Sequence, residues 1–388
     1  MSVSIGCGIS THPDVRVGAI EAAQAARSSL ARAPVDLALV FASGHHLAAP
    51  EATLEGVAEA LGPATMAGCG AGGVLGAGRE IEDGTAVAVW AASLGEGSAE
   101  AFHATVEDVG DGEAALEGMP DLEGASAALL LPDPYSFPTE AALAFLHTRH
   151  PGVPILGGIA SARTDEGSAA LFVNGEVVEE GAVGVRFDGV EILPCVSQGA
   201  APVGPELTVT AGEGNVIAEL AGRPALEKLR DVIGELDDAE RALVANGLLL
   251  GIVIDGGKPS YERGDFLVRG LVSVDPEDGE IAVAAEVHPG QVVRLHARDA
   301  GSADADLRQT LDMEAHALGG GRPAGALAFT CNGRGRGMFG IPDHDAGVLA
   351  EAFGGAPAAG FFAAGEIGPI GGESFVHGFT ATVAVFAP

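Results

Sequence analysis

The chain has 388 residues, 47% hydrophobic and only 5% aromatic, so it is long enough for two or three domains with cores of small aliphatic side chains. Its formal net charge is −34, so most of its surface would repel DNA or an anionic membrane. No secretion signal opens the sequence, and no uncharged apolar run approaches the roughly 18 residues that span a bilayer. We therefore expect a soluble, cytoplasmic protein that binds neither nucleic acid nor membrane.

Four cysteines are present, and none lies near another in the sequence: Cys7, Cys69, Cys195 and Cys331. They form no CxxC or Cys/His cluster, which argues against a structural zinc site and a disulfide scaffold. The acidic residues are scattered and form no calcium-binding loop. We expect reduced thiols and no metal site.

Helices and strands alternate from the start of the chain. Apolar residues recur at helical spacing from Asp14 to Leu30, which predicts an amphipathic helix that ends before Pro34. The following segments predict a strand at 35–42, a helix at 51–61, a short strand at 65–67, a glycine run at 68–76, and strands at 85–93 and 100–106. This order of elements is the first copy of a pattern that returns twice.

The second copy repeats the same order. It predicts a strand at 125–131, a helix at 139–147, a strand at 153–156 followed by two glycines, and strands at 169–173, 182–187 and 190–196. The dipeptides Asn174-Gly175 and Asp188-Gly189 are strong hairpin signals, because these residue types adopt the positive φ angles of tight turns. We therefore predict hairpins at both positions.

A third, looser copy closes the chain. It predicts a strand at 324–330, a helix at 343–353, a strand at 358–362, a glycine-rich loop at 365–372 and a long strand at 375–386. Strands are also predicted before it, at 248–254, 266–274, 281–287 and 292–297. A helix that begins near Ser302 is expected to bury Leu307, Leu311 and Leu318 before a run of glycines ends it.

Several predicted strands are apolar at consecutive positions, such as LLLGIVI at 248–254, so both of their faces must be covered. The helices are too few to cover both faces of every sheet. The sequence therefore predicts an α+β fold of repeated β-α-β-β-β units, in which layered sheets pack on one another with helices outside, an αββα-like sandwich. The Gly- and Pro-rich stretch after Cys195 predicts a boundary between two domains, 1–195 and 196–388.

Five segments, in order and without large insertions, make the chain resemble the FIST family. Two resemble the FIST N-terminal domain: DLALVFASGHH (36–46) and MAGCGAGGVLGAGREIEDG (66–84). Three are similar to the junction and the C-terminal domain: NVIAELAGRPALEKL (215–229), ALAFTCNGRGRGMFG (326–340) and AAGFFAAGEIGPIGGESFVHGFTA (358–381). The resemblance covers nearly the whole chain.

The resemblance implies a sensory module for a small ligand, proposed in the family to include amino acids. Some bacterial members bind haem, sense nitric oxide and act on histidine kinases. This sequence carries no kinase, cyclase or F-box segment, so the resemblance implies a separate signalling partner such as a histidine kinase. One position departs from the family pattern: Gly70 stands where a serine is expected, so a ligand contact from that hydroxyl is not expected.

The segment TCNGRGRGMFG, 330–340, concentrates positive charge in an acidic protein. Glycines such as Gly333 let a backbone approach a ligand closely, and Arg334 and Arg336 can hold an anionic group such as a carboxylate. The alternative is a structural turn whose arginines pair with nearby acids. The pattern is not a nucleotide-binding fingerprint, since neither GxGxxG nor GxxxxGK[ST] occurs here.

Glu366 lies among glycines and apolar residues near the end of the chain. A carboxylate in such surroundings is costly to bury unless it meets a cation or backbone donors. A ligand with both an amino group and a carboxylate would suit Glu366 together with Arg334. An internal pair between these two residues is the equal alternative.

Cys331 and Asn332 follow a predicted strand, where side chains commonly project into a crevice. We expect Cys331 to form a pocket wall. A thiol-dependent acyl-transfer enzyme, with Cys331 as nucleophile and His377 as base, is one alternative. A haem-based gas sensor with His377 as iron ligand is another, although a core histidine bonded to a carbonyl is commoner.

The glycine run of the first copy, with Cys69 beside it, is a second place where the backbone can approach a neighbouring strand or a ligand. We therefore predict a small-molecule-binding sensory protein of intracellular signal transduction, without catalytic residues and without a cofactor. Its ligand is an amino acid or another small anion. The predicted ligand-binding residues are Cys69, Cys331, Asn332, Gly333, Arg334, Arg336, Glu366 and His377.

Overall fold

The computed structural model describes residues 2–30, 33–110, 113–162, 170–245, 247–261 and 263–388. The chain divides into two compact units. The larger unit contains Met1–Ser197 and Leu307–Pro388, and the smaller unit contains Gln198–Asp306. No helix within the described ranges is long and apolar enough to cross a membrane.

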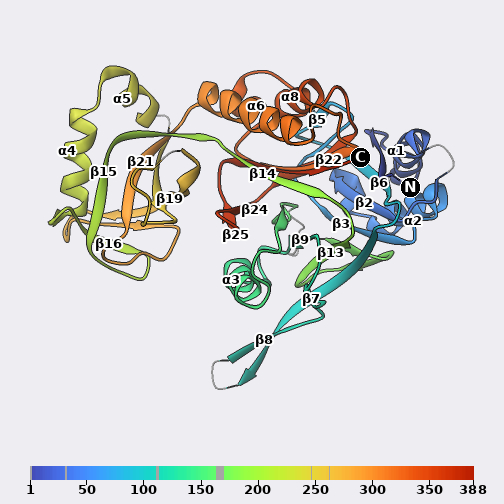
Figure 1. Cartoon of the computed structure of the whole chain (residues 1–388), viewed down its shortest axis with the longest axis horizontal. Helices are drawn as coiled ribbons and strands as arrows, with labels where there is room; N and C mark the ends of the chain where they lie inside the picture. The colour runs from blue at the N-terminus through green and yellow to red at the C-terminus, as the bar shows by residue number, and fades with distance from the viewer. Residues whose placement is uncertain (1, 31–32, 111–112, 163–169, 246, 262) are drawn as a thin grey trace. The chain divides into compact units, whose positions relative to one another are not determined.

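The larger unit contains three βαβ repeats, as the sequence pattern predicted (Figure 1). In each repeat, two parallel strands flank a helix, and a later strand pairs antiparallel with the first of them. The first repeat contains β2 (Leu37–Ser43), α2 (Pro50–Leu61), β3 (Thr65–Gly70) and β6 (Ala86–Ser93). The second contains β9 (Ala127–Pro132), α3 (Thr139–Arg149), β10 (Ile155–Gly158) and β13 (Ala182–Asp188). The third contains β22 (Gly325–Cys331), α8 (His344–Ala352), β23 (Ala358–Ala363) and β26 (Thr380–Phe386).

The repeats exchange hairpins in a ring. The first repeat gives β4 (Val74–Gly76) and β5 (Arg79–Ile81) to the third sheet, where β4 pairs with β23. The second gives β11 (Leu171–Val173) and β12 (Glu176–Val178) to the first sheet, where β11 pairs with β3. The third gives β24 (Glu366–Ile370) and β25 (Glu373–His377) to the second sheet, where β24 pairs with β10.

The opposite edges of the three sheets follow a related rule. β7 (Ser98–Gly110), with β8 (Glu113–Glu117), follows the first repeat and joins the second sheet beside β13. β14 (Ile192–Gln198) follows the second repeat and joins the third sheet beside β26. The N-terminal β1 (Ser4–Ser10) takes the equivalent place beside β6 in the first sheet. Every sheet of the larger unit is thus built from more than one part of the chain.

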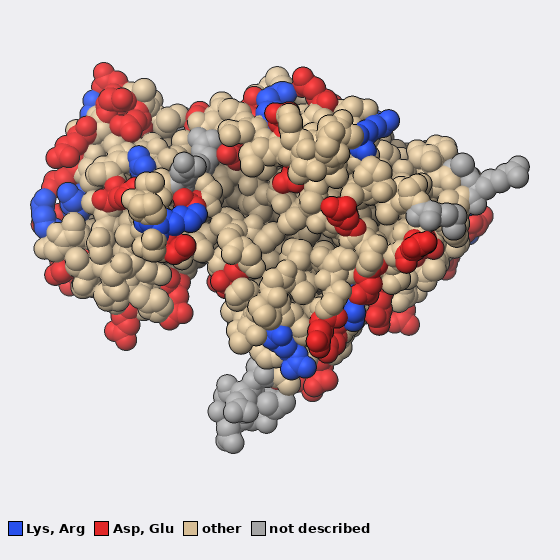
Figure 2. All heavy atoms as spheres, in the orientation of Figure 1, with Lys and Arg blue, Asp and Glu red and all other residues tan. Residues whose placement is uncertain are grey.

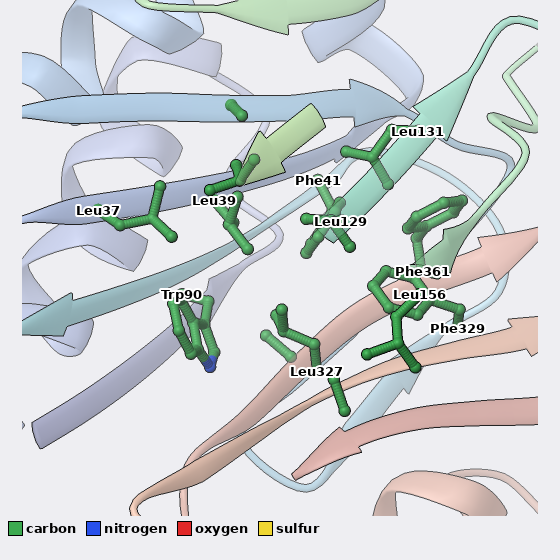
Figure 3. Close-up of a cluster of buried hydrophobic side chains, with 14 of the residues drawn as sticks. Leu37, Leu39, Phe41, Trp90, Leu129, Leu131, Leu156, Leu327, Phe329 and Phe361 are labelled. Carbon is green, nitrogen blue, oxygen red and sulfur yellow. The ribbon is translucent and has the colours of Figure 1, made fainter. Parts of the chain in front are cut away.

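Side chains that alternate along each strand separate a shared core from the outer layers. Leu37, Leu39 and Phe41 of β2 point into a central core, which they share with residues of the other two sheets (Figure 3). The partners drawn there include Trp90, Leu129, Leu131, Leu156, Leu327, Phe329 and Phe361. Three sheets therefore pack on one another, as the apolar strands required.

The outer face of each sheet is covered by helices. Ala38, Val40 and Ala42 of β2 point away from the central core and form a second cluster with residues of α1 (Val15–Ser29) and α2. α3 covers the second sheet in the same way, and α6 (Ala300–Ala317) and α8 contribute Leu307, Leu311 and Val348 to a cluster on the third. The predicted arrangement of layered sheets with outer helices is confirmed.

The smaller unit is a ring of strands with its own core. Its sheet has the order β15-β21-β18-β19-β20-β16-β17, and β15 also pairs with β16, which closes the ring. α4 (Ala225–Glu235) adds Leu226 and Leu229 to the core. The other elements are β15 (Ala200–Glu213), β16 (Val216–Leu220), β17 (Arg223–Pro224), α5 (Asp238–Ala245), β18 (Leu248–Val253), β19 (Phe266–Asp275), β20 (Glu280–Val283) and β21 (Val292–Arg298).

Some predictions of local structure were wrong. The hairpin at Asn174-Gly175 is confirmed, with φ angles of 48° and 90°, but Asp188-Gly189 joins β13 and β14, which lie in different sheets. The predicted loop at 365–372 contains β24, in which Gly368 lies inside the strand, and only Gly371 and Gly372 form a turn, with φ angles of 63° and 89°. The predicted strand at 375–386 is interrupted between β25 and β26, where Phe379 has a φ of 65°. Residue 169, the predicted start of a strand, lies outside the described residues.

Candidate functional site

The predicted site residues lie in the larger unit, and five of the eight lie at the end of β22 or just after it. There the chain turns back, and the N–H of Arg334 donates to the carbonyl of Cys331 at 2.9 Å. Asn332 is exposed, and Cys331 and Gly333 are half-buried. A short helix, α7 (Arg336–Phe339), follows the turn. The strand end therefore carries both a thiol and a guanidinium, as the sequence indicated.

The Arg334 guanidinium is bound inside the protein. Its Nε and Nη2 donate to the two carboxylate oxygens of Asp345, in the first turn of α8, at 2.7 and 2.9 Å. The two side chains are 0% and 3% exposed. The same carboxylate accepts the Thr330 hydroxyl at 2.6 Å, and Arg334 and these donors hold the pKa of Asp345 well below its ordinary value despite its burial. A ligand carboxylate therefore cannot occupy this side of the guanidinium.

Glu366 is fully buried at the start of β24. Its Oε2 accepts the backbone N–H of Thr380 at 3.0 Å and the Thr380 hydroxyl at 2.8 Å, while its Oε1 has no hydrogen-bond partner. Burial raises the pKa of Glu366 to about 8, although the Thr380 bonds, Arg334 and Cys331 act in the opposite direction. The carboxyl group is thus held in place by one of its oxygens only.

Cys331, Arg334 and Glu366 form one electrostatic cluster. Asp345 first, and then Glu366 and Cys331, raise the pKa of Arg334 against the effect of its burial, and Arg334 and Cys331 in turn act to lower the pKa of Glu366. Among the described residues, no group accepts a hydrogen bond from Arg334 Nη1. The structure therefore brings together three of the predicted site residues.

His377 has the environment of a core histidine. It lies opposite Glu366 in the pairing of β25 with β24, and its Nε2 donates to the carbonyl of Gly368 at 2.8 Å. The ring of Phe375 lies 6.4 Å away in an edge-on orientation. Since Nε2 is engaged with the backbone, the geometry lends no support to His377 as a haem ligand or as a base for Cys331.

Two other predicted residues lie apart from this cluster. Cys69 is buried in the central core, where burial raises the pKa of its thiol. Arg336 is exposed at the start of α7, and its backbone N–H donates to Glu82 Oε1 at 2.9 Å. At Gly70, a Cβ atom would lie 2.6 Å from the end of the Leu47 side chain, so the serine expected from the family pattern would require Leu47 to move.

An open polar pocket of about 420 Å³ adjoins the loop after β22. All three repeats contribute to it, because the ends of their parallel strands meet here. The N–H of Gly72 donates to Ser161 Oγ at 2.9 Å, and this hydroxyl donates to the carbonyl of Phe362. The lining residues are Gly72, Gly73, Glu82, Asp83, Ser161, Asn332 and Phe362.

The sequence interpretation missed two groups of residues. Asp345 and Glu80 meet at the start of α8, where Glu80 Oε1 accepts the N–H of Ala346 at 2.9 Å. Burial and the charge of Asp345 raise the pKa of Glu80 to about 7. Ser161 and Glu82 were also missed, although Ser161 follows Gly157-Gly158 much as Gly72 follows the glycines of the first repeat. Aligning the repeats would have pointed to Ser161, whereas only the exchanged hairpin brings Glu80 and Glu82 here.

Comparison with known proteins agrees with this architecture. The FIST N domain matches residues 36–223, and the FIST C domain matches residues 225–369. The chain belongs to the FIST family. FIST domains are generally taken as sensory domains in signal transduction.

Two mycobacterial proteins are similar to this FIST protein along almost their whole length. The uncharacterized protein Mb0898c of Mycobacterium bovis is 43% identical over 382 residues, which are 98% of each chain. The uncharacterized protein Rv0628c of Mycobacterium tuberculosis is 43% identical over 382 residues, 98% of this chain and 99% of the relative.

Proposed function

We propose that this FIST protein is a small-molecule sensor of intracellular signal transduction that binds its ligand in the pocket where the three repeats meet. The pocket carries this proposal because it is polar, about 420 Å³ in volume, and bordered by the predicted residue Asn332. Ligand sites commonly occur in such crevices outside the carboxyl ends of parallel strands.

The charge of the pocket favours a ligand with an amino group. Glu82 and Asp83 line it, whereas Arg334 faces Asp345 and Glu366 in the interior. The glycine backbone and the Ser161 and Asn332 side chains offer further polar contacts. An amino acid, with its ammonium group near Glu82 and Asp83, fits these groups better than a simple anion does.

Ligand binding could produce a signal because residues of all three repeats line the pocket. A ligand that touches all three repeats binds one arrangement of them better than another, and only such a difference in affinity shifts a conformational equilibrium. The proposed output is a separate cytoplasmic partner such as a histidine kinase.

A thermal-shift screen with an amino-acid panel tests the proposal. A ligand at one hundred times its Kd should stabilise the protein by about 2.7 kcal/mol, which gives a rise of several degrees in Tm. Gly72→Leu should abolish this rise, because its Cβ would point toward Ser161 and Asn332 with its nearest contacts at 3.7 to 3.9 Å.

Gly347→Leu is the matched control. Gly347 is exposed in α8, and no atom lies within 4 Å of its Cβ position, so this variant adds the same side chain outside the pocket. It should keep the full ligand-induced rise in Tm. If Gly72→Leu also keeps that rise, the ligand binds elsewhere and the assignment of the pocket fails.

A further inference from the structure

Three oxygen atoms surround the place where Gly72 lacks a side chain, in the wall of the pocket between the three repeats. A Cβ atom at Gly72 would lie 3.7 Å from the carbonyl oxygen of Ser161, 3.8 Å from Ser161 Oγ and 3.9 Å from Asn332 Oδ1. We call these three atoms the oxygen cluster. Because they come from the second and third repeats, the cluster exists only where the repeats meet.

The oxygen cluster offers hydrogen-bond acceptors to a ligand. The Ser161 hydroxyl donates its proton to the carbonyl of Phe362 and accepts the N–H of Gly72 at 2.9 Å, so a ligand can meet only its second lone pair. The Ser161 carbonyl is an acceptor by nature, and Asn332 turns its amide oxygen to the same point. A ligand group that binds here must therefore bring N–H or O–H donors.

Backbone donors of the pocket wall are already bound within the protein. The N–H of Phe362 donates to the carbonyl of Gly73, and the N–H of Asn332 donates to the carbonyl of Ala363, both at 3.0 Å. No lysine or arginine is among the described residues that line the pocket. A ligand carboxylate would therefore lack these partners, and the acidic residues of the wall would repel it.

Two carboxylates border the glycine next to Gly72. A Cβ atom at Gly73 would lie 2.9 Å from the Cα of Glu82, and Asp83 follows in the pocket wall. One oxygen of Glu82 accepts the N–H of Arg336 at 2.9 Å. Consecutive α-carbons are only about 3.8 Å apart, so the carboxylates and the oxygen cluster border the same small cavity.

We propose that the ligand of this pocket is a small diamine, an aliphatic cation with two primary ammonium groups and no carboxylate. One ammonium group binds Glu82 and Asp83, and the other donates to the oxygen cluster. An ammonium group has three donors and no acceptor, which suits both places. The proposal rests on the proposed function, because it concerns the same pocket. It narrows the ligand to molecules in which a second amino group replaces the carboxylate of an amino acid.

Three related compounds test this proposal. Putrescine is a linear diamine, ornithine is the same diamine with a carboxylate added, and butylamine has a single amino group. Isothermal titration calorimetry with the full-length protein gives their dissociation constants, in about 0.3 M NaCl to screen general attraction to the acidic surface. Putrescine should bind about tenfold more tightly than either of the others, because butylamine loses one set of charge-assisted hydrogen bonds and ornithine adds a repelled charge.

Asn332→Asp tests the oxygen cluster by the direction of its effect. The change keeps the size of an exposed side chain and adds a negative charge to the cluster. The Kd of putrescine should fall several-fold, and that of butylamine should change less. A Kd of putrescine that rises or stays constant would contradict an ammonium group at this place. Asn215→Asp, which adds the same charge at an exposed position of the smaller unit, is the control and should leave both constants unchanged.

Gly72→Leu distinguishes a failure of this proposal from a failure of the proposed function. The variant should lose putrescine binding, and Gly347→Leu should keep it. If Gly72→Leu binds putrescine as the native protein does, the diamine is attracted to the acidic surface and the diamine proposal is wrong. If ornithine binds at least as tightly as putrescine and Gly72→Leu abolishes its binding, the pocket is a ligand site but not a diamine site. If neither these compounds nor the amino-acid panel depends on Gly72, both proposals fail.

Discussion

The ion pair between Arg334 and Asp345 removes Arg334 from the groups that a ligand carboxylate can reach. Sequence alone left two alternatives for Arg334, a ligand clamp or an internal partner, and the partner is Asp345. The sequence alone could not identify Asp345 as this partner. Asp345 lies beyond the turn and α7, and its distance from Arg334 depends on how α8 packs on β22. The sequence did indicate the strand end that carries Cys331 and Arg334, and it indicated Glu366 separately, since strand ends and isolated charges are local features.

Asp345→Asn should be strongly destabilising, because it leaves a buried guanidinium without its counter-charge. Breaking such a pair typically costs about 3–5 kcal/mol in the free energy of unfolding, which urea denaturation can measure. Glu351→Gln, in the same helix, is the control: its pair with Arg308 is exposed, with side chains 72% and 45% accessible, and its loss should cost less than about 1 kcal/mol. Similar losses in the two variants would show that Asp345 is not the main counter-charge of Arg334.

At the scale of elements, the sequence predicted most strands and helices but not their sheets. Alternating and continuous apolar runs identified β2, β9 and β22 because the runs report burial directly. The exchange of hairpins was not predicted, because a dipeptide such as Asp188-Gly189 reports a turn and not the sheet that the next strand joins. Glycines misled the interpretation at β24, where Gly368 lies inside a strand against the side chains of Val196 and Thr382.

Close contact between parallel strands requires glycine at equivalent places in the three repeats. A Cβ at Gly68, Gly157 or Gly360 would lie 1.9, 2.0 or 1.7 Å from the carbonyl oxygen of the neighbouring strand. Gly360→Ala should therefore lower the free energy of unfolding by about 3 kcal/mol or more, at the upper end of the range for overpacking. Gly347→Ala, on the open face of α8, should be neutral or stabilising. Urea denaturation of both variants would reveal whether the Gly360 backbone can shift to accept a methyl group.

At the scale of the whole molecule, the formal net charge is −34. On the face shown in Figure 2, acidic side chains are scattered among other residues and form no single dense patch. The carboxyl groups that matter for stability are instead the buried ones. Glu80 and Glu366 have pKa values raised from 4.5 to about 7 and about 8.

The folded chain should therefore lose stability as pH rises toward 8. Between pH 4.5 and the raised pKa values, the folded state holds protons that the unfolded state has released, so the free energy of unfolding falls by up to about 1.4 kcal/mol per pH unit for each group. His46, with a pKa lowered from 6.5 to about 4, acts in the opposite direction only below pH 6.5. Urea denaturation from pH 6.5 to 8 measures the effect of the two carboxyl groups without that of His46. Glu366→Gln should reduce the fall of the free energy of unfolding with pH over this interval. A free energy that rises with pH over this interval would contradict the assigned protonation.

The ring of exchanged hairpins also bears on how the chain is made. The second sheet needs β24 and β25, which end at His377, and the third needs β4 and β5 from near the start. During synthesis, the first and second repeats leave the ribosome before the hairpin β24–β25 does. Until then, the backbone groups of β10 that bond to β24 have no partner strand. Contacts of such long sequence separation form slowly and expose strand edges to aggregation in the meantime. The edge of β10 is therefore open to other strands until the hairpin of the third repeat has been synthesised.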